Sequence, residues 1–171
     1  MKRVLIIDDA AFIRRILRSM LEKNQYRVVG EAENGLIGLE KYNARKPDVV
    51  LLDIVMPVMD GLECLKQLKR LNPNVNVIIC STVDDPKVVQ EIYQLGVIDF
   101  ITKPIKEERL MRTLKKLFSG EPISFAREDD DDDDDDDRSY SSRGKSSRYG
   151  RYDHDDEDDD DYEIDFLDEP F

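Results

Sequence analysis

Short runs of apolar residues alternate along the chain with longer segments in which apolar side chains recur at helical spacing. The first run, residues 4–7, is continuous and ends at two aspartates, as expected for a strand that is buried on both faces. Residues 12–21 then carry apolar side chains on one face of a predicted helix. The same alternation predicts strands at 26–32, 49–53, 75–81 and 98–102, and helices at 35–46, 62–71, 86–95 and 106–118.

Five apolar strands that alternate with five helices require a parallel sheet with helices on both of its faces. Right-handed crossover connections leave few possible topologies for such a chain. We therefore predict an α/β fold, with a doubly wound five-stranded parallel sheet of order 2-1-3-4-5, as in flavodoxin-like proteins.

Charge and composition divide the chain after residue 118. Residues 128–171 contain 22 acidic and 5 basic residues, a net charge of −17, whereas residues 1–127 contain 17 acidic and 21 basic residues, a net charge of +4. Long blocks of like charge repel one another and cannot bury a core. We expect one domain over residues 1–118 and a disordered tail over residues 119–171, strongly acidic but interrupted by basic residues.

Several locations and partners are disfavoured by the sequence. The longest apolar stretch, residues 49–59, is interrupted by Asp53 and is far shorter than the ~20 residues of a membrane span. No signal peptide is evident, so we expect a cytoplasmic protein that does not enter a membrane. The Arg- and Tyr-containing block at 138–152 is flanked by aspartates that cancel its field, and we expect no nucleic-acid binding.

Two further features concern cysteine and arginine. Cys64 and Cys80 lie in apolar surroundings and are predicted to be reduced thiols that pack in the core. The first helix carries Arg14, Arg15 and Arg18, which we expect mainly to face outward. The last helix carries five more basic residues: Lys106, Arg109, Arg112, Lys115 and Lys116.

Residues with reactive or charged side chains follow the predicted strands. Asp8 and Asp9 follow the first strand, Asp53 ends the third, Ser81 ends the fourth and Lys103 follows the fifth. Each has an ordinary structural explanation when taken alone, such as a helix cap or a solvated lysine. Because the carboxyl ends of parallel strands meet at one edge of the sheet, we expect all five side chains to converge there.

Three converging carboxylates predict a metal site. Two such charges ~5 Å apart repel by roughly 3 kcal/mol at an effective dielectric of about 20. Mg2+ prefers oxygen ligands and is held by one or two carboxylates together with water and phosphate, so it fits this site. A metal bound there would align a phosphoryl group with a carboxylate nucleophile, for which Asp53 is the candidate, to give an acyl phosphate. Lys103 can pair with the phosphoryl oxygens, and Ser81 can donate a hydrogen bond to one of them.

These motifs resemble those of the response-regulator receiver family, and within it the chemotaxis regulators of the CheY kind. The resemblance covers residues 1–118. It rests on the sequences VLIIDD at 4–9, EAENG at 31–35, DIVMPVMDG at 53–61, Ser81 and DFITKP at 99–104.

The resemblance implies a function and a set of roles. Asp53 would accept a phosphoryl group from a phosphohistidine of a partner histidine kinase, and Mg2+ would be held by Asp8, Asp9, Asp53 and the backbone carbonyl of Val55. Lys103 would precede a cis peptide bond to Pro104.

Two further roles concern the switch itself. Ser81 would move toward the phosphoryl group, and Phe100 would change rotamer. Thr82 follows Ser81 in place of the usual alanine, so either hydroxyl is available and we favour Ser81. Phe100 stands where some chemotaxis members have tyrosine, and it lacks a hydroxyl with which to bind a target.

We therefore expect a monomeric two-component response regulator that catalyses only its own phosphorylation and dephosphorylation. It would switch the binding of an output protein, such as the flagellar motor switch, in chemotaxis or motility. A phosphorelay intermediate would have a similar sequence. A metal-dependent aspartyl-phosphate phosphatase would need an acid two residues after the nucleophile, where this chain has Val55. An adaptor that has lost the chemistry is disfavoured because the acidic residues and Lys103 are intact.

Overall fold

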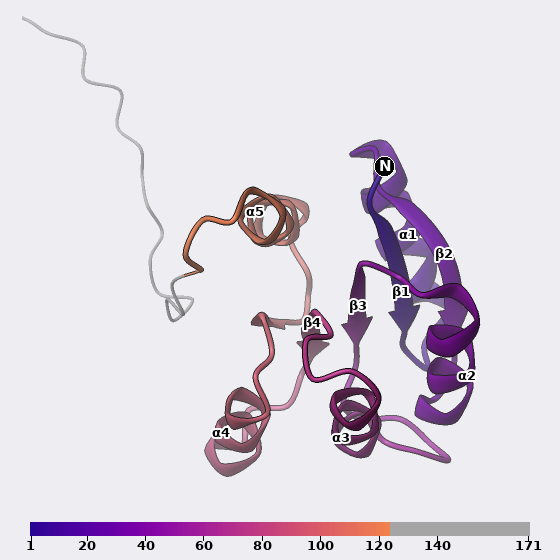
Figure 1. Cartoon of the computed structure of the whole chain (residues 1–171), viewed down its shortest axis with the longest axis vertical. Helices are drawn as coiled ribbons and strands as arrows, with labels where there is room; N and C mark the ends of the chain where they lie inside the picture. The colour runs from indigo at the N-terminus through magenta and orange to yellow at the C-terminus, as the bar shows by residue number, and fades with distance from the viewer. Residues whose placement is uncertain (124–171) are drawn as a thin grey trace, which may run out of the picture. The chain divides into compact units, whose positions relative to one another are not determined.

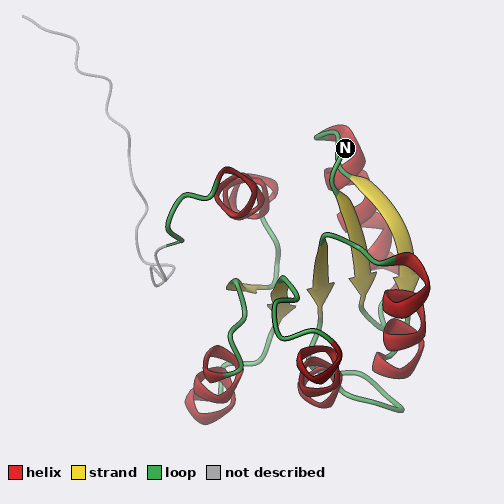
Figure 2. Cartoon of the chain, viewed as in Figure 1, coloured by secondary structure: helices red, strands yellow, loops and turns green. Residues whose placement is uncertain are grey.

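The computed structural model describes residues 1–123, and the predictions for the rest of the acidic tail lie outside this range. The described chain alternates strands with helices throughout (Figures 1 and 2). The strands are β1 (Arg3–Ile7), β2 (Arg27–Ala32), β3 (Val49–Leu52), β4 (Val77–Ser81) and β5 (Asp99–Thr102). The helices are α1 (Ala11–Lys23), α2 (Gly35–Arg45), α3 (Gly61–Leu71), α4 (Pro86–Gln94) and α5 (Glu107–Ser119).

The five strands form one parallel sheet of order β2-β1-β3-β4-β5, which confirms the predicted topology. The arrows of β1, β2 and β3 accordingly point the same way in Figure 2. The chain leaves β1 toward β2 and later returns to the other side of β1 with β3, so the strand order reverses between β1 and β3. The functional crevice of such sheets lies beyond the carboxyl ends of the strands at this reversal.

Apolar residues of the strands fill two layers, one on each face of the sheet. Successive side chains of a strand point to opposite faces, so Leu5 and Ile7 pack with α2, α3 and α4, whereas Val4 and Ile6 pack with α1 and α5. Figure 1 shows α3 and α4 on the opposite side of the sheet from α5. This two-sided burial explains why the strands are continuous apolar runs.

The two cysteines belong to these layers, as predicted. Cys64 of α3 packs in the first layer and Cys80 of β4 in the second, and both are free thiols with at most 1% of their surface exposed. Burial raises the pKa of Cys64 to about 12 and raises the pKa of Cys80 as well. Both thiols are therefore protonated and unreactive at neutral pH.

Three helices begin at side-chain caps that the sequence supplies. Asn34, Asp60 and Asp85 accept hydrogen bonds from the first-turn amides of α2, α3 and α4. The first helix differs, because the residue before it is Ala10, which has no capping side chain. The last helix ends at Ser119 and is followed by Gly120, whose φ of 76° suits glycine. None of the helices in residues 1–123 is long and apolar enough to cross a membrane.

Candidate functional site

Asp8 and Asp53 lie side by side because β1 and β3 are in register. Ile7 is paired with Leu52, and the parallel hydrogen bonding continues past the strand end, since the amide of Asp53 donates to the carbonyl of Ile7 at 2.9 Å. Asp8 is 1% exposed and Asp53 is 5% exposed. Two buried carboxylates next to each other are costly unless a cation or hydrogen-bond donors satisfy them.

Lys103 supplies the cation. Its Nζ lies 2.7 Å from Oδ2 of Asp8 and 3.1 Å from Oδ2 of Asp53. The peptide bond between Lys103 and Pro104 is cis, as the family resemblance implied, and the amide of Lys103 donates to the carbonyl of Ser81 at 3.0 Å. The end of β5 thus brings the ammonium across β4 to the carboxylates of β1 and β3.

Backbone amides hold the second oxygen of each buried carboxylate. The amide of Ala10 donates to Oδ1 of Asp8 at 2.9 Å, and the amide of Ile54 donates to Oδ1 of Asp53 at 2.7 Å. Together with Lys103, these bonds fix both carboxylates from two directions, so each is held in one orientation.

A third carboxylate, that of Asp9, completes an acidic group. Asp8, Asp9 and Asp53 each offer one oxygen atom, and these atoms all lie within 4.8 Å of one another. One ammonium faces three carboxylates, so the cluster keeps a net negative charge. Hard oxygen donors at this spacing, with one of them exposed, fit the mixed protein and water coordination of Mg2+.

Burial and mutual attraction shift the pKa values in the cluster. Burial raises the pKa of Asp8 above its ordinary value, although hydrogen bonds from Lys103 and Ala10 oppose this. Burial favours a lower pKa for Lys103, but the hydrogen bond to Asp8 and the charge of Asp53 outweigh it and raise that pKa. Lys103 is therefore fully protonated at neutral pH and remains a fixed positive charge.

The loop after Asp53 is drawn tightly against α3. The amide of Gly61 donates to the carbonyl of Ile54 at 2.7 Å, and a Cβ atom at Gly61 would lie only 1.9 Å from the carbonyl oxygen of Asp53. Glycine is thus required at this close approach. Val58 in the same loop has a φ of 68°, which is unusual for a β-branched residue. The backbone carbonyl of Val55 remains a predicted ligand.

The two predicted switch residues are both buried. Ser81 is completely buried and its Oγ accepts a hydrogen bond from the amide of Val83 at 3.3 Å, whereas Thr82 is exposed. Phe100 is 8% exposed and packs in the core layer with α2, α3 and α4. Their roles in switching stay predictions.

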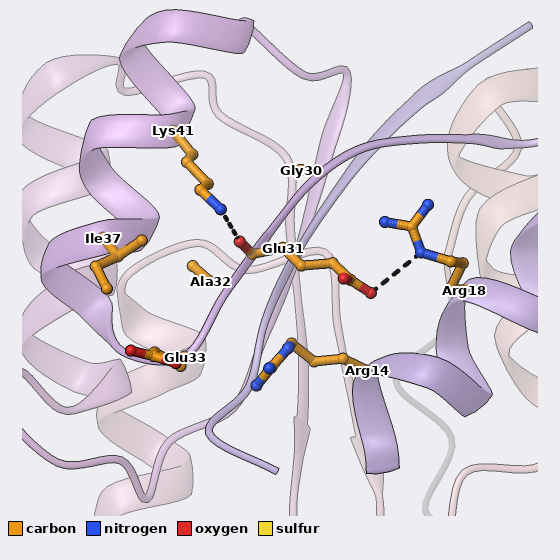
Figure 3. A pocket seen from close by; sticks show the side chains of 8 residues that line it. All are labelled: Arg14, Arg18, Gly30, Glu31, Ala32, Glu33, Ile37 and Lys41. Carbon is orange, nitrogen blue, oxygen red and sulfur yellow. Dashed lines mark hydrogen bonds and ion pairs between the residues drawn. The ribbon is translucent and has the colours of Figure 1, made fainter. Parts of the chain in front are cut away.

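Sequence reasoning missed Arg14 as part of this site. Its Nη1 donates to the backbone carbonyls of Asp8 at 2.7 Å and Asp9 at 3.2 Å, so it is not mainly outward as expected. Arg18 stays at the surface, with a side chain that is 38% exposed and lies 3.0 Å from Oε1 of Glu22 and 3.2 Å from Oε1 of Glu31 (Figure 3). The helical pattern locates Arg14 on α1, but nothing in it indicates that its partners are the backbone carbonyls of Asp8 and Asp9.

A second buried group of charges was also missed, on β5 and α5. Asp99 is 1% exposed and is paired with Arg109, whose Nη1 lies 2.7 Å from Oδ2 of Asp99. Thr113 donates to the same oxygen at 2.8 Å. Arg109 is therefore committed to an internal partner, unlike the exposed Arg112 and Lys115 of the same helix.

Comparisons with known proteins agree with this fold. Residues 4–115 match the family described as the response regulator receiver domain. Chemotaxis protein CheY of Thermotoga maritima is 43% identical over 116 residues, which are 68% of this chain and 97% of that protein. Chemotaxis protein CheY of Bacillus subtilis is 42% identical over 114 residues, 67% of this chain and 95% of that protein.

Solved structures of response regulators have the same fold as this chain. The response regulator domain of Thermotoga maritima CheB superposes with a TM-score of 0.65 at 33% identity, over 71% of this chain and 99% of that one. A chain of the CheX–CheY–BeF3–Mg2+ complex from Borrelia burgdorferi superposes with a TM-score of 0.66 at 28% identity, over 68% of this chain and 89% of that one. The resemblance predicted from the sequence motifs is confirmed.

Proposed function

Because the chain belongs to the response regulator receiver domain family and acts in two-component signalling, we propose that it is a phosphoacceptor switch, phosphorylated on Asp53 by a partner histidine kinase in a Mg2+-dependent reaction. The observation that carries this proposal is the charge imbalance at the carboxyl edge of the sheet. Three carboxylates converge there against the single ammonium of Lys103. Such a site is incomplete without a further cation, and a bound divalent ion favours the arrival of an anionic phosphoryl group.

Mg2+ would be held by Asp8, Asp9 and Asp53 with the carbonyl of Val55. When bound, it would neutralise the phosphoryl oxygens and align the phosphorus with the nucleophile. Asp53 is suited to act as the nucleophile because the amide of Ile54 and Lys103 hold its two oxygens in place. One oxygen of Asp53 forms the new bond to phosphorus as the bond to the imidazole nitrogen of the donor breaks, and the imidazole keeps the electron pair and takes up a proton.

Two residues would then respond to the new acyl phosphate. Lys103 already spans Asp8 and Asp53, so its ammonium can move from the Asp53 carboxylate to a phosphoryl oxygen without crossing the site. Ser81 ends the neighbouring strand. Its hydroxyl oxygen accepts from the amide of Val83, and its hydroxyl hydrogen can donate to another phosphoryl oxygen. Phe100, on the strand that leads to Lys103, would change rotamer to signal this rearrangement.

Exposed apolar side chains at the same edge support docking of a protein phosphodonor. Phe12 at the start of α1 is 66% exposed, and Val55 and Val58 in the loop after Asp53 are 63% and 78% exposed. Apolar surface beside a reactive group is typical of a binding site for another protein. The relatives named chemotaxis protein CheY favour chemotaxis as the pathway. The target in this proposal is an output protein such as the flagellar motor switch.

The test uses the full chain and a small phosphodonor such as acetyl phosphate, with intact mass as the measurement. We expect one added phosphoryl group with Mg2+ and none with a chelator. Asp53→Asn should remain unlabelled, whereas Glu33→Gln, which removes an exposed acid at the same edge, should be labelled normally. Labelling without Mg2+ would contradict the proposal, and so would labelling of Asp53→Asn.

A further inference from the structure

The three carboxylates of the site are not held equally well. Asp8 and Asp53 each accept hydrogen bonds from a backbone amide and from Lys103. The carboxylate of Asp9 accepts no hydrogen bond from any residue in the range 1–123. The direction of the Asp9 side chain therefore depends on the conformation of its own backbone.

The guanidinium of Arg14 fixes that backbone. One nitrogen, Nη1, donates to two consecutive carbonyls, those of Asp8 at 2.7 Å and Asp9 at 3.2 Å. The helical hydrogen bonds of α1 begin with the amide of Arg14 and the carbonyl of Ala10, so the two preceding carbonyls have no helical partner. A donor shared by adjacent carbonyls restrains both peptide planes and with them the direction in which Asp9 points.

Arg14 lies apart from the bonds that its basic neighbours make. Figure 3 shows Arg18 bonded to the carboxylate of Glu31 of β2 and Lys41 bonded to the backbone carbonyl of Glu31, whereas Arg14 takes part in neither bond. All four residues line a groove of about 550 Å³ beside β2. Arg15, next along α1, has the same charge but is exposed and contacts neither carbonyl.

We propose that Arg14 is a positioning residue for Mg2+, because its hydrogen bonds to the carbonyls of Asp8 and Asp9 aim the Asp9 carboxylate at the metal site. The inference rests on the proposed function but makes a claim of its own about metal affinity. The change in Mg2+ affinity that it predicts for loss of the Arg14 charge is opposite to the change expected from charge repulsion alone. Two cations repel, so removing the charge of Arg14 would by itself tighten Mg2+ binding, whereas loss of positioning weakens it.

The experiment is a Mg2+ titration of the full chain, followed by the backbone amide shifts of Asp9 and Ala10 without any phosphodonor. These signals report the site alone, so Mg2+ bound by acidic residues elsewhere does not contribute. Arg14→Met keeps the apolar stem and removes the guanidinium, and we expect the affinity to fall by roughly 10-fold, as for other groups that orient metal ligands. Arg14→Lys keeps a donor and should recover part of the affinity, but not all of it.

Arg15→Met is the matched control, and its affinity should equal or slightly exceed that of the wild type. Unchanged or tighter Mg2+ binding by Arg14→Met would overturn the proposal, and so would an equal loss in Arg15→Met. If Arg14→Met does not fold, Arg14→Lys still decides, because we expect about 3-fold weaker binding and full wild-type affinity would contradict the inference. A wild type that binds Mg2+ but is never labelled on Asp53 would refute the proposed function and leave this inference standing.

Discussion

Two ionic clusters lie at opposite ends of β5, and they differ in how their charges balance. The balanced cluster comprises Asp99 at the start of the strand with Arg109 and Thr113 of α5. The acidic cluster comprises Asp8, Asp9 and Asp53 with Lys103, which follows the end of the strand. Both contain a carboxylate that is almost completely buried.

In the balanced cluster, every charge has its partner. Arg109 binds Asp99 with two nitrogens, at 2.7 and 3.2 Å, and Thr113 and the amide of Phe100 each donate to Asp99 at 2.8 Å. In the acidic cluster, Lys103 binds two of the three carboxylates, those of Asp8 and Asp53, and so supplies one positive charge against three negative ones. Burial of charge is common to both, so the unmatched negative charge is the feature that distinguishes a binding site from a structural ion pair.

The largest expected effect is on the balanced cluster. Arg109→Ala leaves the buried carboxylate of Asp99 without its cation, and we expect the free energy of unfolding to fall by about 3 kcal/mol in chemical denaturation. Arg112→Ala removes an exposed arginine of the same helix and should change the free energy of unfolding by less than about 0.5 kcal/mol. Equal effects of the two substitutions would show that the Asp99–Arg109 pair is not a structural element.

The acidic cluster should respond with the opposite sign when Mg2+ is absent. At an effective dielectric of about 20, each carboxylate neighbour, whose nearest oxygen lies within 4.8 Å, repels Asp53 by roughly 3.5 kcal/mol or more, and Lys103 at 3.1 Å attracts it by roughly 5 kcal/mol. The two repulsions exceed the one attraction, so Asp53→Asn should stabilise the metal-free protein by about 1–2 kcal/mol. Added Mg2+ should stabilise the wild type but not this variant. Destabilisation by Asp53→Asn would mean that Lys103 already balances the cluster.

Backbone strain next to the acidic cluster should have a smaller effect. Val58 has a φ of 68°, which costs a β-branched residue about 1 kcal/mol or more, whereas asparagine tolerates this conformation. We expect Val58→Asn to raise the free energy of unfolding by about 1 kcal/mol. Val55→Asn, an exposed valine in the same loop, should leave it almost unchanged. A similar gain from both would point to removal of exposed apolar surface as the cause.

The smallest effect is a pH dependence that comes from Asp8. Burial raises the pKa of Asp8 above 3.8, so between that pH and the native pKa the folded protein binds more protons than the unfolded chain. The contribution of Asp8 to stability therefore increases as the pH falls through this window. Without Mg2+, the free energy of unfolding of Asp8→Asn minus that of the wild type should decrease as the solution is acidified from pH 7. An increase of this difference on acidification would contradict the raised pKa.

The fold and the acidic cluster could be predicted because their signals are local. The strands are apolar runs buried on both faces, and the residues that follow them, such as Asp8, Asp53 and Lys103, meet at one edge by topology alone. Element boundaries were less exact. β4 begins at Val77 and not at residue 75, because the amide of Val75 is used in a turn with the carbonyl of Asn72.

The inward arginines could not be predicted because their partners are not local. Arg109 binds a carboxylate on another element, and Arg14 binds backbone carbonyls, which leave no mark on the sequence. Helical periodicity gives the face on which a residue lies, but a long side chain can turn back from the edge of that face toward the sheet. The balanced cluster and the positioning contact of Arg14 therefore emerged only from the structure.

The most direct test of the account is the location of the phosphoryl group. The full chain would be phosphorylated with a small phosphodonor and Mg2+, reduced with borohydride at the acyl phosphate, digested and sequenced by mass spectrometry. Unmatched charge predicts modification at Asp53 alone, with Asp99 of the balanced cluster untouched. Modification spread over Asp8, Asp9 and Asp53, or found at Asp99, would contradict the claim that the acidic cluster is a phosphoacceptor site built around one nucleophile.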